Sequence, residues 1–220
     1  MSGPAELVSH DVMTADSTPT TGPLVIACGA LVRELRAVLG HAGLAELVDV
    51  EYLPAPMHNR PERIVPAIAA RLAEVPVDRP VVLGYADCGT GGLLDAYIAE
   101  AEHSITRLPG DHCYEFFAGS DRFAELHEGE IGTFYLTDFL AKHFDALIWQ
   151  GLGLEDHPEL LPTYFGSYRR LVLLVQQPDA AVVSAAERAA ERLGLALVVE
   201  HTGLDPFARP VELAIRRGAD

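Results

Sequence analysis

Lysine is nearly absent from this sequence, and acidic residues outnumber basic ones two to one. The 220 residues contain 32 aspartates and glutamates against 16 lysines and arginines, so the formal net charge at pH 7 is −16. Lys142 is the single lysine and hence the one candidate for Schiff-base chemistry. Nucleic acids and anionic membranes need a basic protein surface. We therefore expect no nucleic-acid partner and no membrane partner.

Long apolar runs and a leader-like start are also lacking. No stretch approaches the ~20 apolar residues of a membrane-spanning helix. Residues 1–23 hold no basic segment followed by an apolar core, so we read no secretory signal there. Their serine, threonine, proline and glycine content predicts a flexible N-terminal tail. The expectation is a cytoplasmic protein with one folded domain over residues 24–220.

Cysteine is scarce, with three residues at positions 28, 88 and 113. No two of them have the close spacing of a CxxC pair or a zinc finger. Disulfide frameworks are rare in cytoplasmic proteins. We therefore expect free thiols or metal ligands rather than disulfides.

The remaining composition is that of a folded globular protein, with 49% hydrophobic and 22% charged residues. Apolar runs predict strands at residues 24–27, 47–53, 81–85, 104–108, 146–149, 171–175 and 195–200. Helical periodicity predicts helices at residues 30–39, 61–74, 93–99, 123–127, 133–144 and 180–193. This alternation predicts an α/β fold: a single doubly wound domain with a mostly parallel sheet and helices on both faces. In such folds the ligand site lies at the carboxyl ends of the strands.

One stretch, residues 81–92, predicts where that site is. An apolar run ends in Tyr85-Ala86-Asp87-Cys88 and continues into Gly89-Thr90-Gly91-Gly92. The glycine turn lacks the ending of a P-loop and the spacing of a dinucleotide fingerprint. Gly89, Thr90 and Gly91 could still cradle a phosphate with backbone N–H groups. Alternatively, they let Cys88 approach a cofactor or substrate.

The other two cysteines have comparable positions. Cys28 ends the first apolar run, and Cys113 follows Pro109-Gly110-Asp111-His112. If the three meet at the strand ends, their thiolates suit a [4Fe–4S] cluster with one free iron. They also suit zinc, completed by water or by His112 or His58. The alternative is that each cysteine is simply a small buried apolar residue, and this alternative is a serious one for Cys28.

Acid–base residues surround these cysteines in the sequence. We predict catalytic or supporting roles for four of them: His58, Asp87, His112 and Glu115. Arg60 or Arg63, beside a predicted helix start, would bind an anion; a capped helix with exposed arginines is the alternative. Weaker candidates, equally explained as caps or solvated turns, are Asp138, His157 and His201.

Six motifs in this order resemble a bacterial and archaeal family known as domain of unknown function 1638. They are Ala27-Cys28-Gly29-Ala30-Leu31, His58-Asn59-Arg60-Pro61 after Leu53-Pro54-Ala55, Asp87-Cys88-Gly89-Thr90-Gly91-Gly92, Pro109-Gly110-Asp111-His112-Cys113-Tyr114-Glu115, Leu136-Thr137-Asp138-Phe139 after Gly132-Thr133, and Gly151-Leu152-Gly153-Leu154 with His157-Pro158-Glu159-Leu160. The resemblance covers about residues 24–203. It brings no settled activity. It implies that the three cysteines and His58 occupy positions that belong to the family's sequence pattern. It also implies an association with corrinoid-dependent methyltransferases, and hence with one-carbon or methylamine metabolism.

Three hypotheses follow for the function. The first is a metal-dependent enzyme (lyase, hydrolase or transferase) whose three-cysteine iron–sulfur or zinc site activates a small-molecule substrate. The second is a non-catalytic carrier of metal, corrinoid or a methyl group for a methyltransferase partner. The third is metal-free thiol chemistry at Cys113 with His112 as base. The aromatic segment 114–117 would permit a homodimer.

Overall fold

The structure, a computed structural model, describes residues 13–14 and 22–219. Most of the predicted tail, residues 1–23, therefore lies outside the described residues. Within that range, the two-residue strand β1 (Met13–Thr14) pairs antiparallel with β3 (Asp49–Leu53). No helix in the described ranges is both long and apolar enough to cross a membrane.

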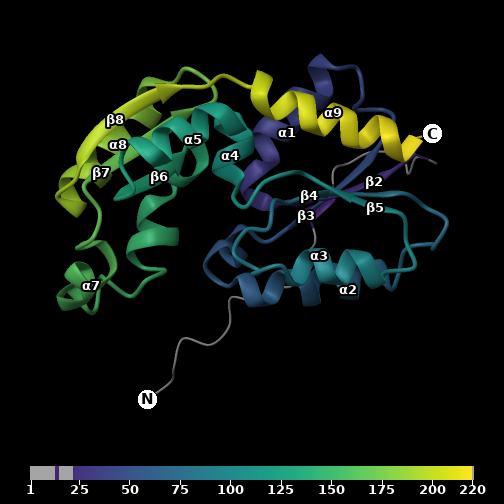
Figure 1. The fold of residues 1–220 in the computed structure, drawn as a ribbon, viewed down its shortest axis with the longest axis horizontal. Coiled ribbons are helices and arrows are strands. Elements are labelled where there is room, and N and C mark those ends of the chain that lie inside the picture. Colours follow the sequence, from purple (N-terminus) through teal and green to yellow (C-terminus); the bar gives the residue numbers. More distant parts are fainter. Residues whose placement is uncertain (1–12, 15–21, 220) are drawn as a thin grey trace.

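The larger of two sheets has the strand order β1-β3-β2-β4-β5. Its parallel strands are β2 (Leu24–Cys28), β3, β4 (Val81–Gly84) and β5 (Ile105–Arg107). Helices α1 (Val32–His41) and α9 (Asp205–Ala219) cover one face, and α2 (Ile64–Leu72) and α3 (Leu93–Glu100) cover the other (Figure 1). Alternate residues of β2 explain this arrangement: Val25 and Ala27 pack in the core with α1 and α9, whereas Leu24 and Ile26 pack with α2 and α3.

The smaller sheet has the order β6-β7-β8 and is wholly parallel. Its strands are β6 (Thr133–Thr137), β7 (Arg170–Val175) and β8 (Ala196–His201). Helices α6 (Asp138–Lys142) and α8 (Ala180–Leu193) pack on one face through Leu140 and Val182. Three further short helices complete the fold: α4 (Cys113–Ala118), α5 (Ser120–Gly129) and α7 (Leu161–Phe165).

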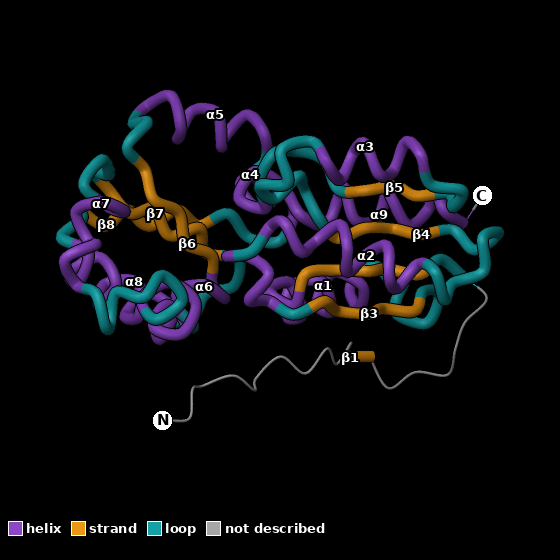
Figure 2. Tube along the Cα trace, turned by 90° about the horizontal axis from the view of Figure 1, so that it is seen from below, coloured by secondary structure: helices purple, strands orange, loops and turns teal. Residues whose placement is uncertain are grey.

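One hydrophobic core joins the two sheets. It contains Val82 of β4, Phe117 of α4, and Tyr135 and Val172 of the smaller sheet. Figure 2 shows the two sheets in opposite halves of the molecule, with α4 between them. The predicted α/β class with parallel strands and helices on both faces is confirmed, but the strands form two sheets rather than one.

Two predicted elements are wrong. Residues 133–144 were expected to be one helix, but Thr133–Thr137 is strand β6 and the helix begins at Asp138. The β-branched and aromatic residues of this segment favour a strand, and Thr137 ends it by accepting a hydrogen bond from Leu140 N at 3.3 Å. Residues 146–149 were expected to be a strand but lie in a π-helical turn, Asp145–Trp149. A four-residue apolar run does not distinguish a strand from a buried helical turn.

Candidate functional site

The three cysteines, distant in the sequence, line one small cavity of about 30 Å³. Cys28 is the last residue of β2, Cys88 follows β4, and Cys113 is the first residue of α4. Each is a half-buried free thiol. Thr137, at the carboxyl end of β6, lines the same cavity. The cavity thus lies where the carboxyl ends of strands from both sheets meet.

Backbone hydrogen bonds bring Cys88 and Cys113 together. The N–H groups of Asp87 and Cys88 donate to the carbonyls of Gly110 at 3.1 Å and Asp111 at 2.8 Å. These bonds continue the β4–β5 pairing into the loop that precedes α4. Cys88 adopts a left-handed conformation with φ 52°, which is uncommon for a residue other than glycine. This turn holds its side chain at the strand end.

A glycine allows Cys28 to lie beside the segment that carries His58. A Cβ on Gly29 would lie 2.9 Å from the Leu53 carbonyl oxygen and 3.1 Å from Ala55 N. His58 lies on the 3₁₀ turn Ala55–Asn59 that follows. Asn59 donates a hydrogen bond to the carbonyl of Leu147, which ties this turn to the half of the molecule that holds the smaller sheet.

The thiols influence one another electrostatically. Burial raises the pKa of Cys28, and burial together with the Cys28 charge raises the pKa of Cys88 to about 12. Burial, followed by the charges of Cys88 and Cys28, raises the pKa of Cys113 well above its ordinary value. In opposition, backbone hydrogen bonds lower the pKa of each thiol: from Ala30 for Cys28, from Ala86 and Cys113 for Cys88, and from Cys113 itself and Tyr114 for Cys113. The metal-free thiols are therefore protonated at neutral pH, and a bound cation would favour their thiolates.

Tyr85, which the sequence analysis did not select, contributes a buried hydroxyl to the cysteine cavity. Its side chain is 2% exposed, and its hydroxyl lies near the Cys28 thiol without a hydrogen bond of regular geometry. Burial, with the charges of Cys28 and Cys88, raises the pKa of Tyr85 well above its ordinary value. The signal in the sequence was a tyrosine at the end of a buried strand, three residues before Cys88.

A larger cavity of about 380 Å³ adjoins the cysteines. Cys88, Cys113 and Gly89 line it together with three histidines, His58, His112 and His127. Aromatic side chains form much of the remaining wall: Tyr114, Phe123, Phe134, Tyr135 and Tyr168. Of the other wall residues, Pro61, Tyr114 and Thr133 belong to the motifs of the family resemblance. No signal in the sequence pointed to Phe123, His127, Phe134, Tyr135 and Tyr168, which come from α5, β6 and the residues before β7.

His58 and His112 are the predicted acid–base residues that line a cavity. His58 borders both cavities, whereas His112 is exposed and borders the larger one. Burial, with a smaller effect from the charge of His112, lowers the pKa of His58. His58 is therefore a neutral imidazole at neutral pH, able to donate or accept one hydrogen bond at each ring nitrogen according to its tautomer.

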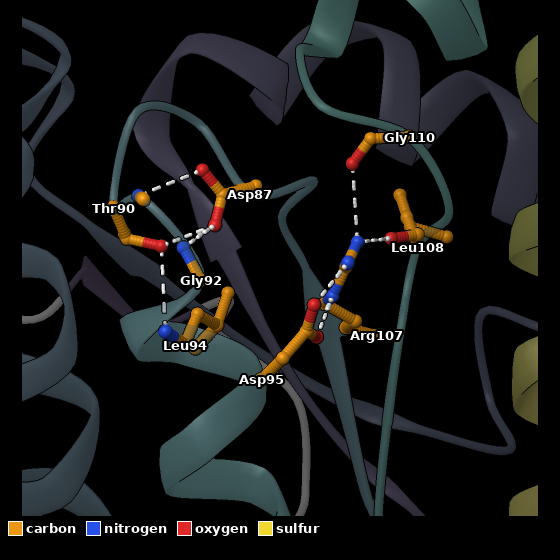
Figure 3. A network of polar contacts seen from close by, with 9 residues as sticks. Asp87, Thr90, Gly92, Leu94, Asp95, Arg107, Leu108 and Gly110 are labelled. Atoms are coloured by element: carbon orange, nitrogen blue, oxygen red, sulfur yellow. Dashed lines mark hydrogen bonds and ion pairs between the residues drawn. The ribbon is translucent and has the colours of Figure 1, made fainter.

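Asp87 and Thr90 hold the glycine turn (Figure 3), and Gly91 is hydrogen-bonded to Asp87 in the same turn. The Asp87 carboxylate accepts hydrogen bonds from Thr90 Oγ1 at 2.6 Å, Gly91 N at 3.0 Å and Gly92 N at 2.9 Å. Burial raises the pKa of Asp87, but these hydrogen bonds outweigh it and leave the pKa below its ordinary value. Thr90 Oγ1 also accepts a hydrogen bond from Leu94 N, in the first turn of α3, at 3.3 Å. These groups position Cys88 rather than line either cavity.

Glu115, in the first turn of α4, has a comparable role for the loop that precedes this helix. Its carboxylate accepts hydrogen bonds from Asp111 N at 3.1 Å and Ser120 Oγ at 2.9 Å. The same loop is held by Arg107, which donates to the carbonyls of Leu108 and Gly110 at 2.8 and 3.2 Å and forms an ion pair with Asp95 at 2.5 Å (Figure 3). Glu115 therefore fixes the segment that carries Cys113.

The other candidates lie away from both cavities. Arg60 is exposed and lines neither. Asp138 is buried and accepts hydrogen bonds from Gln176 N and Gln177 N at 3.2 and 2.9 Å, which joins β6 to the end of β7. His157 is exposed and lies 3.2 Å from Glu159, and His201 is exposed at the end of β8.

These features define an α/β protein whose cysteines converge at the carboxyl ends of parallel strands. A family model described as protein of unknown function, DUF1638, matches residues 52–210, so the chain belongs to this family. His58, Cys88 and Cys113 lie within the matched residues, and Cys28 lies before them. The family resemblance read from the sequence motifs is thereby confirmed.

Among solved structures, the proline iminopeptidase-related protein of Thermus thermophilus is similar over 95% of this chain and 98% of its own, with 15% sequence identity and a TM-score of 0.36. Comparison with curated proteins gave no significant match.

Proposed function

We propose that this protein is a cytoplasmic metalloenzyme in which Cys28, Cys88 and Cys113 hold an iron–sulfur cluster or a zinc ion. The observation that carries the proposal is that all three thiols line one cavity at the carboxyl ends of strands. Three sulfur donors match the ligand preference of iron–sulfur clusters and zinc. The backbone N–H groups beside the sulfurs add the kind of hydrogen bonds that stabilise metal-bound thiolates.

The two metal groups make different demands on the three sulfurs. Among residues 13–14 and 22–219, no three His, Cys, Asp or Glu side chains are grouped so that they could hold one metal ion. A zinc ion needs each sulfur at about 2.3 Å from a single point. In a [4Fe–4S] cluster, by contrast, each cysteine binds a different iron, and three cysteines leave the fourth iron free.

The bound group would supply an open coordination position that acts as a Lewis acid. The chain's own groups divide into two sets. His58 borders both cavities and is the residue placed to exchange a proton with a small molecule in the larger one. Asp87, Thr90 and Glu115 hold the loops that carry Cys88 and Cys113.

The high thiol pKa values argue against the metal-free alternative. A nucleophilic cysteine needs a depressed pKa, whereas burial raises that of Cys113. His112 precedes Cys113 in the chain, yet its side chain is exposed. The proposal therefore assigns Cys113 as a metal ligand rather than as a free nucleophile.

A carrier of metal or of a methyl group is the second candidate. The observation that favours it is that loop hydrogen bonds occupy Asp87 and Glu115, which leaves fewer groups for acid–base chemistry. A corrinoid cargo fits less well, since the larger cavity of about 380 Å³ is the size of a small organic molecule. A corrinoid methyltransferase remains a proposed partner. Catalytic turnover would distinguish the enzyme from the carrier.

The proposed partners are otherwise a small-molecule substrate and a second copy of the chain. The net charge of −16 supports the absence of nucleic-acid and membrane partners from this proposal. Support for the homodimer from the segment 114–117 is weak, because Phe116 and Phe117 are buried and contact Phe207 with ring centroids 5.2 and 5.1 Å apart.

Anaerobic purification followed by iron, zinc and acid-labile sulfide analysis tests the proposal. A brown protein with iron and sulfide identifies a cluster, and a colourless protein with one zinc identifies the zinc alternative. Protein that contains neither after purification and reconstitution under anaerobic conditions would overturn the proposal.

A further inference from the structure

The wall of the larger cavity is formed mostly by rings and contains no permanent charge. Five aromatic side chains and three histidines line it, together with smaller residues. None of its wall residues is Asp, Glu, Lys or Arg, although these make up 22% of the sequence. In the metal-free protein, a charged ligand that entered would lose hydration without meeting a permanently charged side chain in the wall. The cavity therefore favours a neutral ligand.

The rings are arranged as a partly stacked wall. Tyr114 and Tyr135 stack with centroids 5.4 Å apart and an interplanar angle of 28°. Phe123 lies 5.2 Å from Tyr135, and Phe134 meets Tyr168 edge to face at 5.5 Å. Tyr114, Phe123 and Phe134 are only partly buried, so their rings present surface to the cavity. A flat aromatic ligand gains the most contact against such a wall.

The volume and position of the cavity limit the ligand further. About 380 Å³ is at the lower end of the range for small-molecule sites, which suits one or two fused rings. The cavity reaches Cys88 and Cys113 at one end, and the neutral imidazole of His58 provides a polar contact beside them.

From these observations we infer that the larger cavity binds a neutral, planar aromatic molecule of one or two rings, with a polar atom directed at His58. Its assignment as the substrate rests on the proposed function. Its binding to the aromatic wall does not, because the wall is formed by protein side chains alone.

Titration with a matched set of two-ring compounds tests the inference. The probes are 2-naphthol, its saturated and non-planar analogue decahydro-2-naphthol, and the anion 2-naphthoate, each added to the full chain at pH 7. Calorimetry should show saturable one-to-one binding of 2-naphthol, with the other two at least about fivefold weaker. Failure of 2-naphthol to saturate, or equal binding of all three probes, would overturn the inference.

Two tyrosines close in sequence provide a variant and its control. Tyr168 lines the cavity, whereas Tyr164 of α7 is 41% exposed and lines neither cavity. Tyr168→Leu should weaken 2-naphthol binding roughly fivefold, Tyr168→Phe should retain it, and Tyr164→Leu should leave it unchanged. If Tyr168→Leu does not fold, Phe123→Leu takes its place with the same expectation. An equal loss in Tyr164→Leu would count against the assigned wall.

The titration is carried out on metal-free protein as well as on protein purified anaerobically. Binding of 2-naphthol by both supports the aromatic site whatever the metal analysis gives. Absence of iron, sulfide and zinc with intact 2-naphthol binding would overturn the proposed metal centre and leave the aromatic site in place. Absence of 2-naphthol binding to protein that holds a metal would overturn the aromatic site alone.

Discussion

Backbone hydrogen bonds from Ala86 and from Cys113, the first residue of α4, lower the pKa of the Cys88 thiol. Burial and the Cys28 charge raise the pKa of that thiol to about 12, and these hydrogen bonds oppose the rise. A donor aimed at a buried sulfur is useful chiefly when the sulfur carries negative charge. This relationship favours thiolates that are neutralised by a bound cation.

Replacement of Cys88 by serine should remove the metal centre. Serine keeps the size of the side chain but offers a hard hydroxyl in place of a soft thiolate. We expect Cys88→Ser to bind iron or zinc at least about tenfold less tightly, with a far-ultraviolet circular dichroism spectrum like that of the wild type. Metal analysis of both proteins after identical anaerobic reconstitution measures the effect. Full metal retention by the variant would remove Cys88 from the ligand set.

Loss of the Tyr85 hydroxyl should raise the pKa of Cys28. The hydroxyl lowers that pKa, so metal-free Tyr85→Phe should require a higher pH for alkylation of Cys28 by iodoacetamide. Because this hydroxyl has no regular hydrogen bond, the free energy of unfolding should change by less than about 1 kcal/mol. Mass spectrometry of the Cys28 peptide over a pH series measures the shift. Tyr97→Phe on α3 serves as control, and the same profile in all three proteins would contradict the assigned contact.

The close approach of β2 and β4 should be sensitive to one methyl group. A Cβ on Gly84 would lie 2.6 Å from the Ala27 Cβ, so Gly84→Ala forces apart the strands that carry Cys28 and Cys88. We expect a destabilisation of about 2 kcal/mol, measured by denaturant unfolding, together with reduced metal content.

Gly40→Ala provides the matched control for this substitution. Gly40 lies within α1, and a Cβ there meets nothing within 4 Å. Alanine favours helix over glycine, so this variant should be more stable by about 0.5–1 kcal/mol. Equal effects of the two substitutions would refute the argument from strand spacing.

A buried carboxyl should make stability fall as pH rises. Glu34 is 1% exposed, and neither carboxyl oxygen has a hydrogen-bond partner of regular geometry among the described residues. Burial, with a contribution from the charge of Asp138, raises the pKa of Glu34 despite Arg33 and Lys142 nearby. Its contribution to stability is therefore complete below the unfolded pKa of about 4.3 and is lost as pH rises through the folded pKa.

Glu34→Gln should not lose stability in this way as pH rises, because glutamine does not ionise. Thermal melts from about pH 4 to pH 8 should show the variant gaining on the wild type as pH rises. Glu187→Gln, on the exposed side of α8, is the control and should follow the wild type. A constant difference between Glu34→Gln and the wild type at every pH would show that the carboxyl does not titrate as described.

Much of the local structure was predictable, because its signals are local. The helix predicted at residues 180–193 is α8, where Asp179 accepts a hydrogen bond from Ala181 N at 2.9 Å and Gly194 ends the helix with φ 69°. The sequence allows a helix cap at Asp138, next to the observed cap Thr137, yet the predicted helix extends back to Thr133. The cap was the correct signal, and the strand before it was missed.

Long-range arrangement was less accessible. The residue pattern of β6 does not indicate that this strand pairs with β7 rather than with a strand of the larger sheet. The meeting of the cysteines could be anticipated from their positions at strand ends. The aromatic wall could not, because Phe123, Phe134 and Tyr168 line the same cavity as Cys88 only through the tertiary packing of the two halves of the molecule.

The helix α9 has a consequence for how the molecule can be divided. After β8 the chain returns to the larger sheet (Figure 1), where α9 packs on α1 and α4. The polypeptide thus passes from the larger sheet to the smaller one between β5 and β6, and back again between β8 and α9. Because two chain segments connect the halves of the molecule, they restrict any hinge motion that would open the cysteine cavity. Proteolytic nicking of the crossing at residues 202–204 would yield two fragments that remain associated through Phe207 and its aromatic neighbours.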